Sequence, residues 1–171
     1  IRYICGFTGS AASCLITQDD SYFISDGRYD VQSREQVQNM ARYIDFGSHI
    51  SIVTKNNLVQ NGSNLAFESD HTSVSQYRTM ADSFPKVVWK STSMLMENLQ
   101  AVKDESELDA IRTAVEITDT IYAEILPMLK PGTTEKEVAH QMVLRYRQES
   151  EGEAYSPIVA GGSNGALPHA V

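Results

Sequence analysis

An apolar stripe over residues 108–129 is the feature that most narrows the folds open to this chain. Its apolar residues recur at spacings of three and four, which predicts one long helix with a core-facing side. The stripe consists of Leu108, Ile111, Val115, Tyr122, Ile125 and Leu129, widened by Ala114, Ile117 and Ile121. Each large apolar side chain gains about 1.5–3 kcal/mol on burial, so a stable protein needs a sheet to cover this face.

Short motifs set the ends of this helix and predict the next elements. Asp104 stands three residues before Glu107, a variant of the capping box, and Pro131-Gly132 cannot continue the helix. Thr134 and Glu137 form a second box, which starts another helix ending before Gly152. Residues 157–160 are predicted as a strand. Two helices and one strand cannot bury their own apolar faces, so we expect the covering sheet beyond Val171.

The first hundred residues have a different pattern, in which short strands alternate with helices. Strands are predicted over 11–17, 21–25, 42–46, 65–68 and 86–89, and helices over 28–40, 50–59 and 72–83. The first two strands are joined by the turn-favouring residues 18–20 and form a hairpin. This alternation predicts an α/β domain with a mixed sheet and flanking helices, closing near residue 100.

The charge distribution suggests a boundary near Val102 and argues against some partners. The chain carries 14 basic and 22 acidic residues, a net charge of −8, which disfavours nucleic acid because phosphates are repelled. Residues 1–102 have 8 basic and 10 acidic side chains, whereas residues 103–171 have 6 and 12.

No apolar run approaches the roughly 20 residues of a membrane span, and no signal peptide is visible, so the expected location is cytoplasmic. Cys5 and Cys14 are read as small buried apolar residues rather than as a disulfide.

The segment from Gly161 to Gly165 matches the Gly-x-Ser-x-Gly pattern that presents a serine nucleophile between a strand and a helix. Pro168 follows closely and residues 166–169 are predicted as extended, so Ser163 would lack the helix that this turn requires. Only His169 follows as a possible base. A glycine-rich turn is therefore the preferred interpretation, and a serine hydrolase remains an alternative.

The other polar candidates have simpler structural explanations. Glu137 and His140 have the spacing of half a carboxylate-bridged metal site, but no second such pair occurs and a solvated helix face is preferred. His49 and His71 are expected on the surface. Residues 26–29, Asp-Gly-Arg-Tyr, are expected to form a turn with a charge pair that caps the next helix. His169 differs because it follows a strand, a glycine-rich turn and a stiffening proline, a placement that can fix a polar side chain at a cleft.

Read in order, these segments resemble the aminopeptidase P, prolidase and creatinase family of pita-bread metallohydrolases. In the first part the resemblance rests on residues 3–10 (YICGFTGS), 15–17 (LIT) and 24–29 (ISDGRY) with Gln32. In the second part it rests on 102–108 (VKDESEL), 111–114 (IRTA), 130–135 (KPGTTE) with Glu137-Val138, and 155–162 (YSPIVAGG) running into 164–169 (NGALPH). No single motif is decisive, but their order and spacing together are.

The resemblance implies a fold and its boundaries. Residues 1–102 would be a creatinase/prolidase-type N-terminal domain that lacks its first strand. Residues 103–171 would begin an incomplete α+β pita-bread domain. Both ends of the chain therefore look like those of a fragment.

The resemblance also implies a reaction, namely hydrolysis of the bond between an N-terminal residue and proline in proline-containing peptides. In this family two divalent ions, commonly manganese, activate a bridging water, and a histidine outside the metal shell binds and polarises the substrate. The position that matches this histidine is His169. The family's metal ligands, two Asp, one His and two Glu, all follow the Pro-His segment and would lie beyond Val171, so we expect this chain alone to be inactive. Homo-oligomers are expected, as in most members, and the choice between aminopeptidase P and prolidase stays open.

A different class of function is also compatible with these residues. The same fold serves as a peptide-binding or histone-binding module when the metal ligands are lost. Nothing before Val171 separates such a module from the enzyme.

Overall fold

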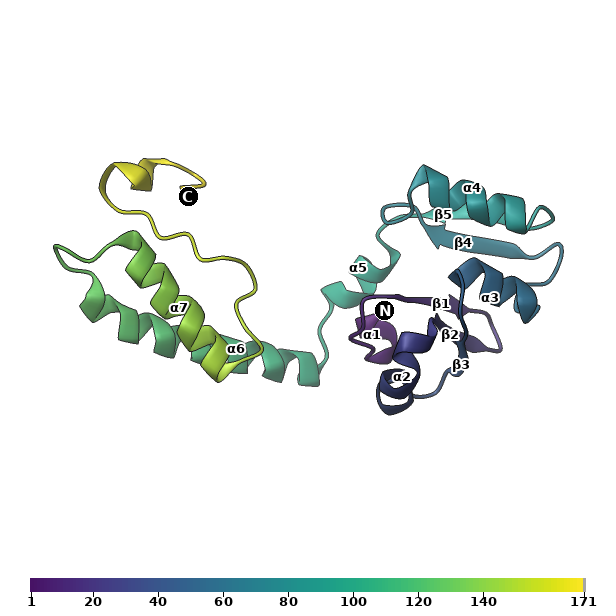
Figure 1. The fold of residues 1–171 in the computed structure, drawn as a ribbon, viewed down its shortest axis with the longest axis horizontal. Coiled ribbons are helices and arrows are strands. Elements are labelled where there is room, and N and C mark those ends of the chain that lie inside the picture. Colours follow the sequence, from purple (N-terminus) through teal and green to yellow (C-terminus); the bar gives the residue numbers. More distant parts are fainter. Residues whose placement is uncertain (171) are drawn as a thin grey trace. The chain divides into compact units, whose positions relative to one another are not determined.

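The computed structural model describes residues 1–170, so Val171, the last residue of the predicted second domain, lies outside the described residues. The chain divides into two compact units, the first comprising residues 1–97 and the second starting at residue 98 (Figure 1). The first unit alternates strands and helices, and the second is built on helices. The predicted α/β class is confirmed.

The first unit contains the expected mixed sheet, with strand order β1-β2-β3. Strand β1 (Ala12–Ile16) pairs antiparallel with β2 (Ser21–Ser25), and β2 pairs parallel with β3 (Ala41–Ile44). The predicted hairpin is confirmed, with Cys14 opposite Phe23. Its turn is closed by Thr17, whose hydroxyl accepts a hydrogen bond from the Asp20 N–H at 2.9 Å.

Two further strands form a separate parallel pair instead of extending that sheet. Strand β4 (Asn64–Glu68) pairs with β5 (Val88–Thr92), and Leu65 lies opposite Trp89. The alternation of strands and helices correctly indicated both strands. It could not show which edges share a ladder, because pairing depends on contacts between distant segments.

The helices of the first unit are shorter than the sequence pattern suggests. They are α1 (Arg2–Cys5), η1 (Gly27–Tyr29), α2 (Asp30–Gln36), α3 (His49–Lys55), α4 (Val74–Ser83) and α5 (Leu95–Ala101), which runs past residue 97. The helix predicted over 28–40 is therefore a short 3₁₀ turn followed by α2, which ends before Val37. Helix α5 was not predicted.

Aromatic and small apolar side chains form the core of the first unit. Phe7, Phe23 and Val37 are buried, and the rings of Phe7 and Phe23 meet edge to face at 4.8 Å. Cys5 and Cys14 are both free and pack against this cluster. Burial, and then the neighbouring Cys5, raise the pKa of the Cys14 thiol to about 12. Both cysteines pack on the core as expected, but they are half-buried rather than fully buried.

The loop from Gly6 to Ser10 is tied to α2 by a network of side chains. Gly6 ends α1 in the left-handed region, with φ of 74°, where a side chain would be strained. Thr8 donates its backbone N–H to Gln36 at 3.0 Å, and Gln32 donates to the Thr8 hydroxyl at 2.9 Å. These bonds hold the loop against α2.

The second unit is a helix pair with a trailing segment. Helix α6 (Glu105–Ile125) continues into η2 (Leu126–Met128), and α7 (Glu135–Glu149) packs against α6. Both predicted capping boxes are present, Asp104 with Glu107 and Thr134 with Glu137. A short 3₁₀ helix, η3 (Gly162–Ala166), follows near the end of the chain.

The strand predicted over residues 157–160 is not formed. Among residues 1–170, no strand of the second unit is available to pair with this segment, so its β-prone sequence has no ladder to join. Val159 is nevertheless held, because it packs against a buried cluster of Ile121, Ile125 and Val138.

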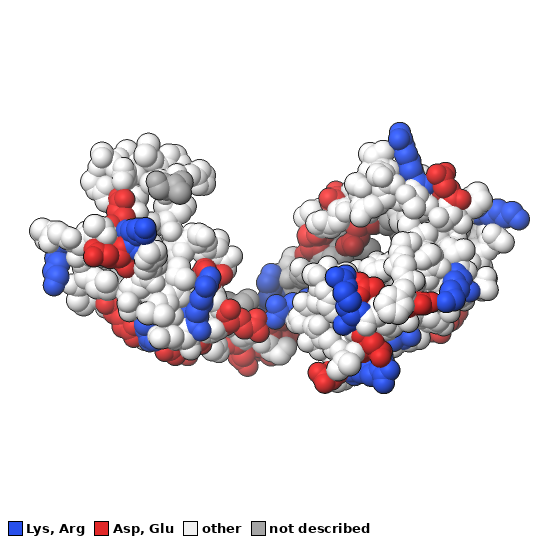
Figure 2. Space-filling view, in the orientation of Figure 1, with Lys and Arg blue, Asp and Glu red and all other residues white. Residues whose placement is uncertain are grey.

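Only part of the apolar stripe on α6 is covered. Ile121 and Ile125 are buried against α7, whereas Ile111, Val115 and Tyr122 are 46%, 52% and 59% exposed. Acidic side chains gather on the lower face of this unit in the view of Figure 2, along α6. The expectation that a further sheet covers the apolar residues stays a prediction.

The capping box of α7 gives a first testable result. Replacement of Thr134 by alanine removes the hydroxyl that accepts a hydrogen bond from the Glu137 N–H at 3.2 Å. We expect a loss of about 1 kcal/mol in the free energy of unfolding of the second unit, measured by urea denaturation. Thr118→Ala is the matched control, since Thr118 lies in mid-helix and its hydroxyl bonds only the Ala114 carbonyl. An equal effect of both variants would contradict the capping role.

Candidate functional site

The loop that carries His169 is fixed by one carboxylate from the start of α7. The Gly161 N–H donates to Glu135 Oε1 at 2.6 Å, and Asn164 Nδ2 donates to the two Glu135 oxygens at 3.1 and 3.0 Å. These hydrogen bonds, the one from Gly161 first, lower the pKa of Glu135. His169 follows η3 in a turn and is exposed. The structure thus places the predicted site residue on an anchored surface loop.

Ser163 lies within the 3₁₀ turn, not at the N-terminus of an α-helix. Its side chain is exposed, and among the described residues no hydrogen bond joins it to a histidine. A serine hydrolase needs such a contact between nucleophile and base. The part of the chain that the structure describes therefore gives no support to the serine hydrolase alternative.

Glu137 is used by the helix cap and not by a metal half-site. Its Oε2 accepts hydrogen bonds from the Thr134 backbone N–H at 2.8 Å and from the Thr134 hydroxyl at 2.9 Å, while His140 is exposed. Within residues 1–170 no group of three or more His, Cys, Asp or Glu residues could hold a metal ion. The carboxylate and imidazole groups of residues 1–170 therefore do not form the ligand set of a two-metal centre.

His49 is placed differently from the prediction. It is half-buried at the start of α3, and its Nδ1 lies 2.8 Å from the Ser13 hydroxyl on β1. Burial lowers the pKa of His49, which the nearby Asp26 carboxylate partly opposes. The surface assignment was wrong because the local sequence is polar while β1, 36 residues earlier, covers the ring. His71 is exposed as predicted and lies 3.3 Å from Glu97.

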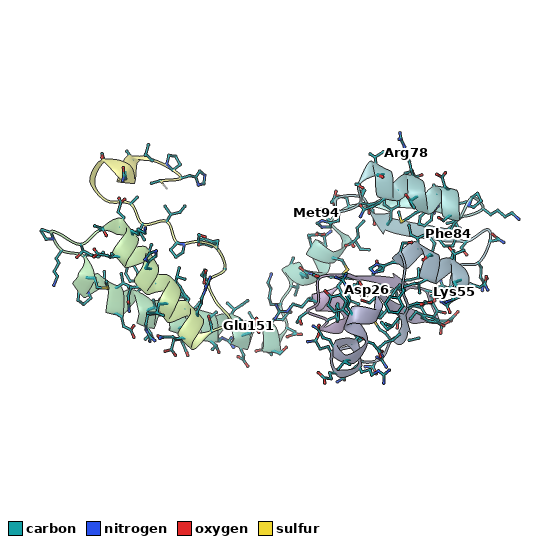
Figure 3. All side chains as sticks on the ribbon, viewed as in Figure 1. Asp26, Lys55, Arg78, Phe84, Met94 and Glu151 are labelled. Atoms are coloured by element: carbon teal, nitrogen blue, oxygen red, sulfur yellow. The ribbon has the colours of Figure 1, made fainter. Side chains whose placement is uncertain are left out.

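The Asp26-to-Tyr29 turn forms the expected cap and charge pair. Asp26, which is labelled in Figure 3, caps η1 by accepting from the Arg28 N–H at 3.0 Å. It also pairs with the Arg28 guanidinium through Nε at 2.9 Å and Nη2 at 2.8 Å. Arg28 holds the pKa of Asp26 at about 2. The turn lies where β2 ends, next to the exposed Phe46 ring that covers Gly27.

The titration of Asp26 is a second testable result. Its folded pKa lies below the ordinary 3.8, so the pairing stabilises the fold above that value and is lost as the pH falls towards 2. We expect the carboxyl ¹³C resonance of Asp26 to titrate near pH 2. In Arg28→Gln the midpoint should rise towards 3.8, with Arg78→Gln as the control. Equal midpoints in the protein and in Arg28→Gln would contradict the pairing.

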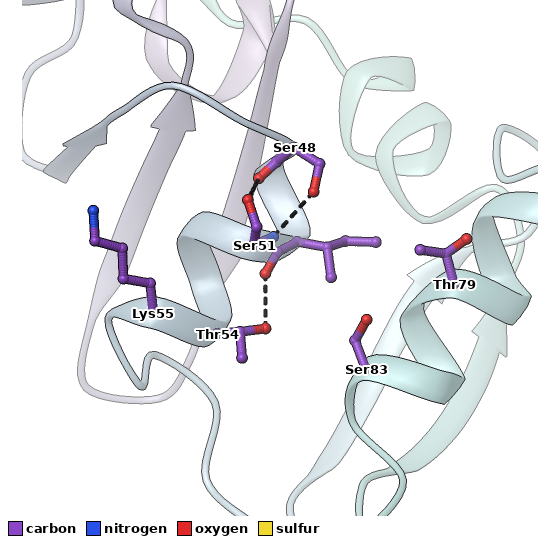
Figure 4. A pocket seen from close by; sticks show the side chains of 7 residues that line it. Ser48, Ser51, Thr54, Lys55, Thr79 and Ser83 are labelled. Atoms are coloured by element: carbon purple, nitrogen blue, oxygen red, sulfur yellow. Dashed lines mark hydrogen bonds between the residues drawn. The ribbon is translucent and has the colours of Figure 1, made fainter.

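A hollow of about 450 Å³ lies between α3 and α4 in the first unit (Figure 4). Most of its polar groups are already hydrogen-bonded or ion-paired within the chain. Ser51 donates to the Ser48 carbonyl at 2.7 Å and Thr54 to the Ile50 carbonyl at 2.9 Å, while Lys55 pairs with Asp45. A ligand site needs polar groups that converge on the ligand, so this hollow is not the candidate site.

Comparison with known proteins gives the class to which this arrangement belongs. Residues 1–102 match the family model for the creatinase/prolidase N-terminal domain, and residues 109–171 match metallopeptidase family M24. The order of an N-terminal α/β domain and the start of a peptidase domain is that of the creatinase/prolidase-type metallopeptidases. This chain belongs to that family, and the resemblance is confirmed.

Individual relatives agree with this assignment. The chain is 30% identical to the uncharacterized peptidase YqhT of Bacillus subtilis over 173 residues, which cover 100% of this chain and 49% of the relative. Among solved structures it is similar to an Xaa-Pro dipeptidase from Bacillus anthracis, with 31% identity and a TM-score of 0.89. It is also similar to an X-Pro aminopeptidase from Thermotoga maritima, with 32% identity and a TM-score of 0.86. Each structural match covers 99% of this chain and 48% of the other, so the chain spans about half the length of these relatives.

The predicted site residues are distributed over several segments of the two units. Ser163 and His169 share one loop, and His140, His49 and His71 lie on other elements. Sequence reasoning missed Glu135, because its place beside the Thr134 capping box suggested only a helix start. Among residues 1–170, no helix is both long enough and apolar enough to cross a membrane.

Proposed function

We propose that this chain is part of a metal-dependent Xaa-Pro peptidase that hydrolyses the bond between an N-terminal residue and proline. The observation that carries the proposal is the structural similarity to an Xaa-Pro dipeptidase and an X-Pro aminopeptidase, each over 99% of the chain. The M24 match over residues 109–171 supports a metallopeptidase.

His169 is the residue of this chain that we assign to the reaction. An imidazole N–H that donates to the substrate carbonyl would stabilise the negative charge that develops on that oxygen. Two divalent ions, with manganese as the proposed metal, would supply the activated water. We place their ligands beyond Val171, and residues 1–171 alone are therefore expected to be inactive.

The same proposal includes the domain boundaries, the cellular location, the oligomeric state and the partners of the protein. Residues 1–102 form the N-terminal domain without its first strand, and residues 103–171 begin the catalytic domain. The extent of the two family matches supports the boundary, and the separation of β1-β2-β3 from β4-β5 supports a missing strand. The protein is proposed to be a cytoplasmic homo-oligomer that acts on proline-containing peptides and binds neither nucleic acid nor membranes.

A chimera tests the activity. Residues 1–171 are joined to the part of the Bacillus anthracis dipeptidase that follows the matching position, and Ala-Pro hydrolysis is measured with manganese. We expect turnover that a chelator abolishes, and none from residues 1–171 alone. His169→Ala should lower kcat by about 10²–10³-fold, as for loss of one oxyanion donor. His140→Ala, on the exposed face of α7, is the control.

Two outcomes would overturn the assignment. Unchanged kcat in His169→Ala would remove that residue from the reaction. Manganese-dependent cleavage by residues 1–171 alone would show that the ligands are not where we place them. Reading the gene past Val171 for Asp, Asp, His, Glu and Glu in that order separates the peptidase from a binding module that has lost them.

A further inference from the structure

Glu135 makes contacts that its place in α7 does not require. It is the first residue of α7, and the capping box there is made by Thr134 and Glu137, which satisfy each other's backbone N–H groups without Glu135. Its carboxylate instead reaches Gly161 and Asn164, which are 26 and 29 residues away in sequence. The three hydrogen bonds that join this loop to α7 all end on Glu135.

The loop depends on these bonds because little else anchors it. The last apolar anchor before it is Val159, which packs on the buried cluster of the helix pair. Within the loop, the Asn164 N–H donates to the Gly161 carbonyl at 3.1 Å, and the Leu167 N–H donates to the Asn164 carbonyl at 2.9 Å. A series of hydrogen bonds therefore links Glu135 to Asn164 and Asn164 to Leu167. The next residue, Pro168, restricts the backbone just before His169.

We propose that Glu135 is a positioning residue that clamps the 161–166 turn and thereby sets the place of His169. The catalytic part of this inference rests on the proposed function, whereas the clamp itself does not. A charged acceptor suits the task, since hydrogen bonds to a carboxylate are shorter and stronger than those between neutral groups.

The test uses the whole 171-residue chain and a swap of hydrogen-bonding partners. In Asn164→Asp two carboxylates face each other and the clamp should break. In the double variant Glu135→Gln with Asn164→Asp, the new amide can donate to the carboxylate introduced at position 164, while its oxygen still accepts from Gly161. If the substitutions only damaged the local structure, the double variant would be more disordered than Asn164→Asp. If the clamp is a specific pairing, adding Glu135→Gln to Asn164→Asp should restore it.

The readout is amide hydrogen exchange at Gly161 together with the ring resonances of His169. Asn164→Asp should speed exchange at Gly161 by about tenfold or more, and the double variant should return it to within about threefold of the original. The His169 resonances should move in the single variant and return in the double. Glu116→Gln, on an exposed part of α6, is the control, and unchanged exchange at Ile121 shows that the helix pair stays folded.

The outcomes separate the clamp from the proposed function. If Asn164→Asp leaves Gly161 exchange unchanged, or the double variant exchanges as fast as the single one, the clamp is wrong. In the chimera, Asn164→Asp should lower kcat with KM within about twofold, and the double variant should restore it. If the double variant restores slow exchange at Gly161 but the chimera is inactive, the proposed function and the catalytic part of this inference are wrong. The clamp itself would still stand.

Discussion

Replacement of Phe23 by alanine is expected to cost the first unit about 3–5 kcal/mol of unfolding free energy. Phe23 is 0% exposed on β2, the middle strand of the mixed sheet, and its ring packs on Phe7 at 4.8 Å. Truncation removes this apolar contact and leaves a cavity, because the sheet cannot close around it. Domain stabilities are about 5–15 kcal/mol, so a large share of the unit's stability should be lost.

Trp89 gives a direct measurement, since it is the single tryptophan of the chain and lies on β5 in the same unit. Urea denaturation followed by its fluorescence should show a much lower midpoint for Phe23→Ala. The matched control is Phe46→Ala, the same substitution at a ring that is 87% exposed, which should change stability by less than about 0.5 kcal/mol. Similar losses for the two variants would contradict the assignment of the core.

Gly9→Ala is expected to destabilise the same unit by overpacking, by about 1–3 kcal/mol. A Cβ at this position would lie 2.3 Å from Phe7 Cζ and 2.8 Å from Tyr29 Cε1. Neither ring can move easily. Phe7 is 1% exposed within the core, and the Tyr29 hydroxyl lies 2.7 Å from Ser10 Oγ.

The control for this variant is a glycine with room for a methyl group. At Gly165 the nearest atom to a new Cβ would be the Ala160 carbonyl oxygen at 3.7 Å, an ordinary contact. Thermal unfolding by circular dichroism should show a lower Tm for Gly9→Ala and little change for Gly165→Ala. A Tm for Gly9→Ala equal to that of the unsubstituted chain would mean that the loop relaxes around the methyl group, against this prediction.

Much of the fold could be predicted because its signals are local. The hairpin follows from two β-prone runs with a turn between them, and the starts of α6 and α7 follow from capping boxes at Asp104 and Thr134. The capping bonds join residues three apart, so the sequence pattern contains both partners. Helix α5 was missed because it lacks such a signal, and the strand over 157–160 was wrong because β-propensity needs a pairing partner.

The candidate site was only partly predictable. His169 stood out in the sequence by its place after a glycine-rich turn and a proline, and its proposed role came from the resemblance to a family. The hydrogen bonds that join the preceding turn to Glu135 came from the structure. The periodicity of the sequence predicted the apolar stripe on α6. It did not predict which residues of the stripe are buried.

The sequence by itself determined the α/β class, the starts of α6 and α7, the hairpin and the family. Only the tertiary structure decided that β4 and β5 pair apart from the mixed sheet, that His49 is half-buried beside Ser13, and that Glu135 holds the turn before His169. The physical reason is the separation of the partners. Contacts between residues 26 or 36 positions apart depend on how the whole chain closes on itself, and no local pattern specifies them.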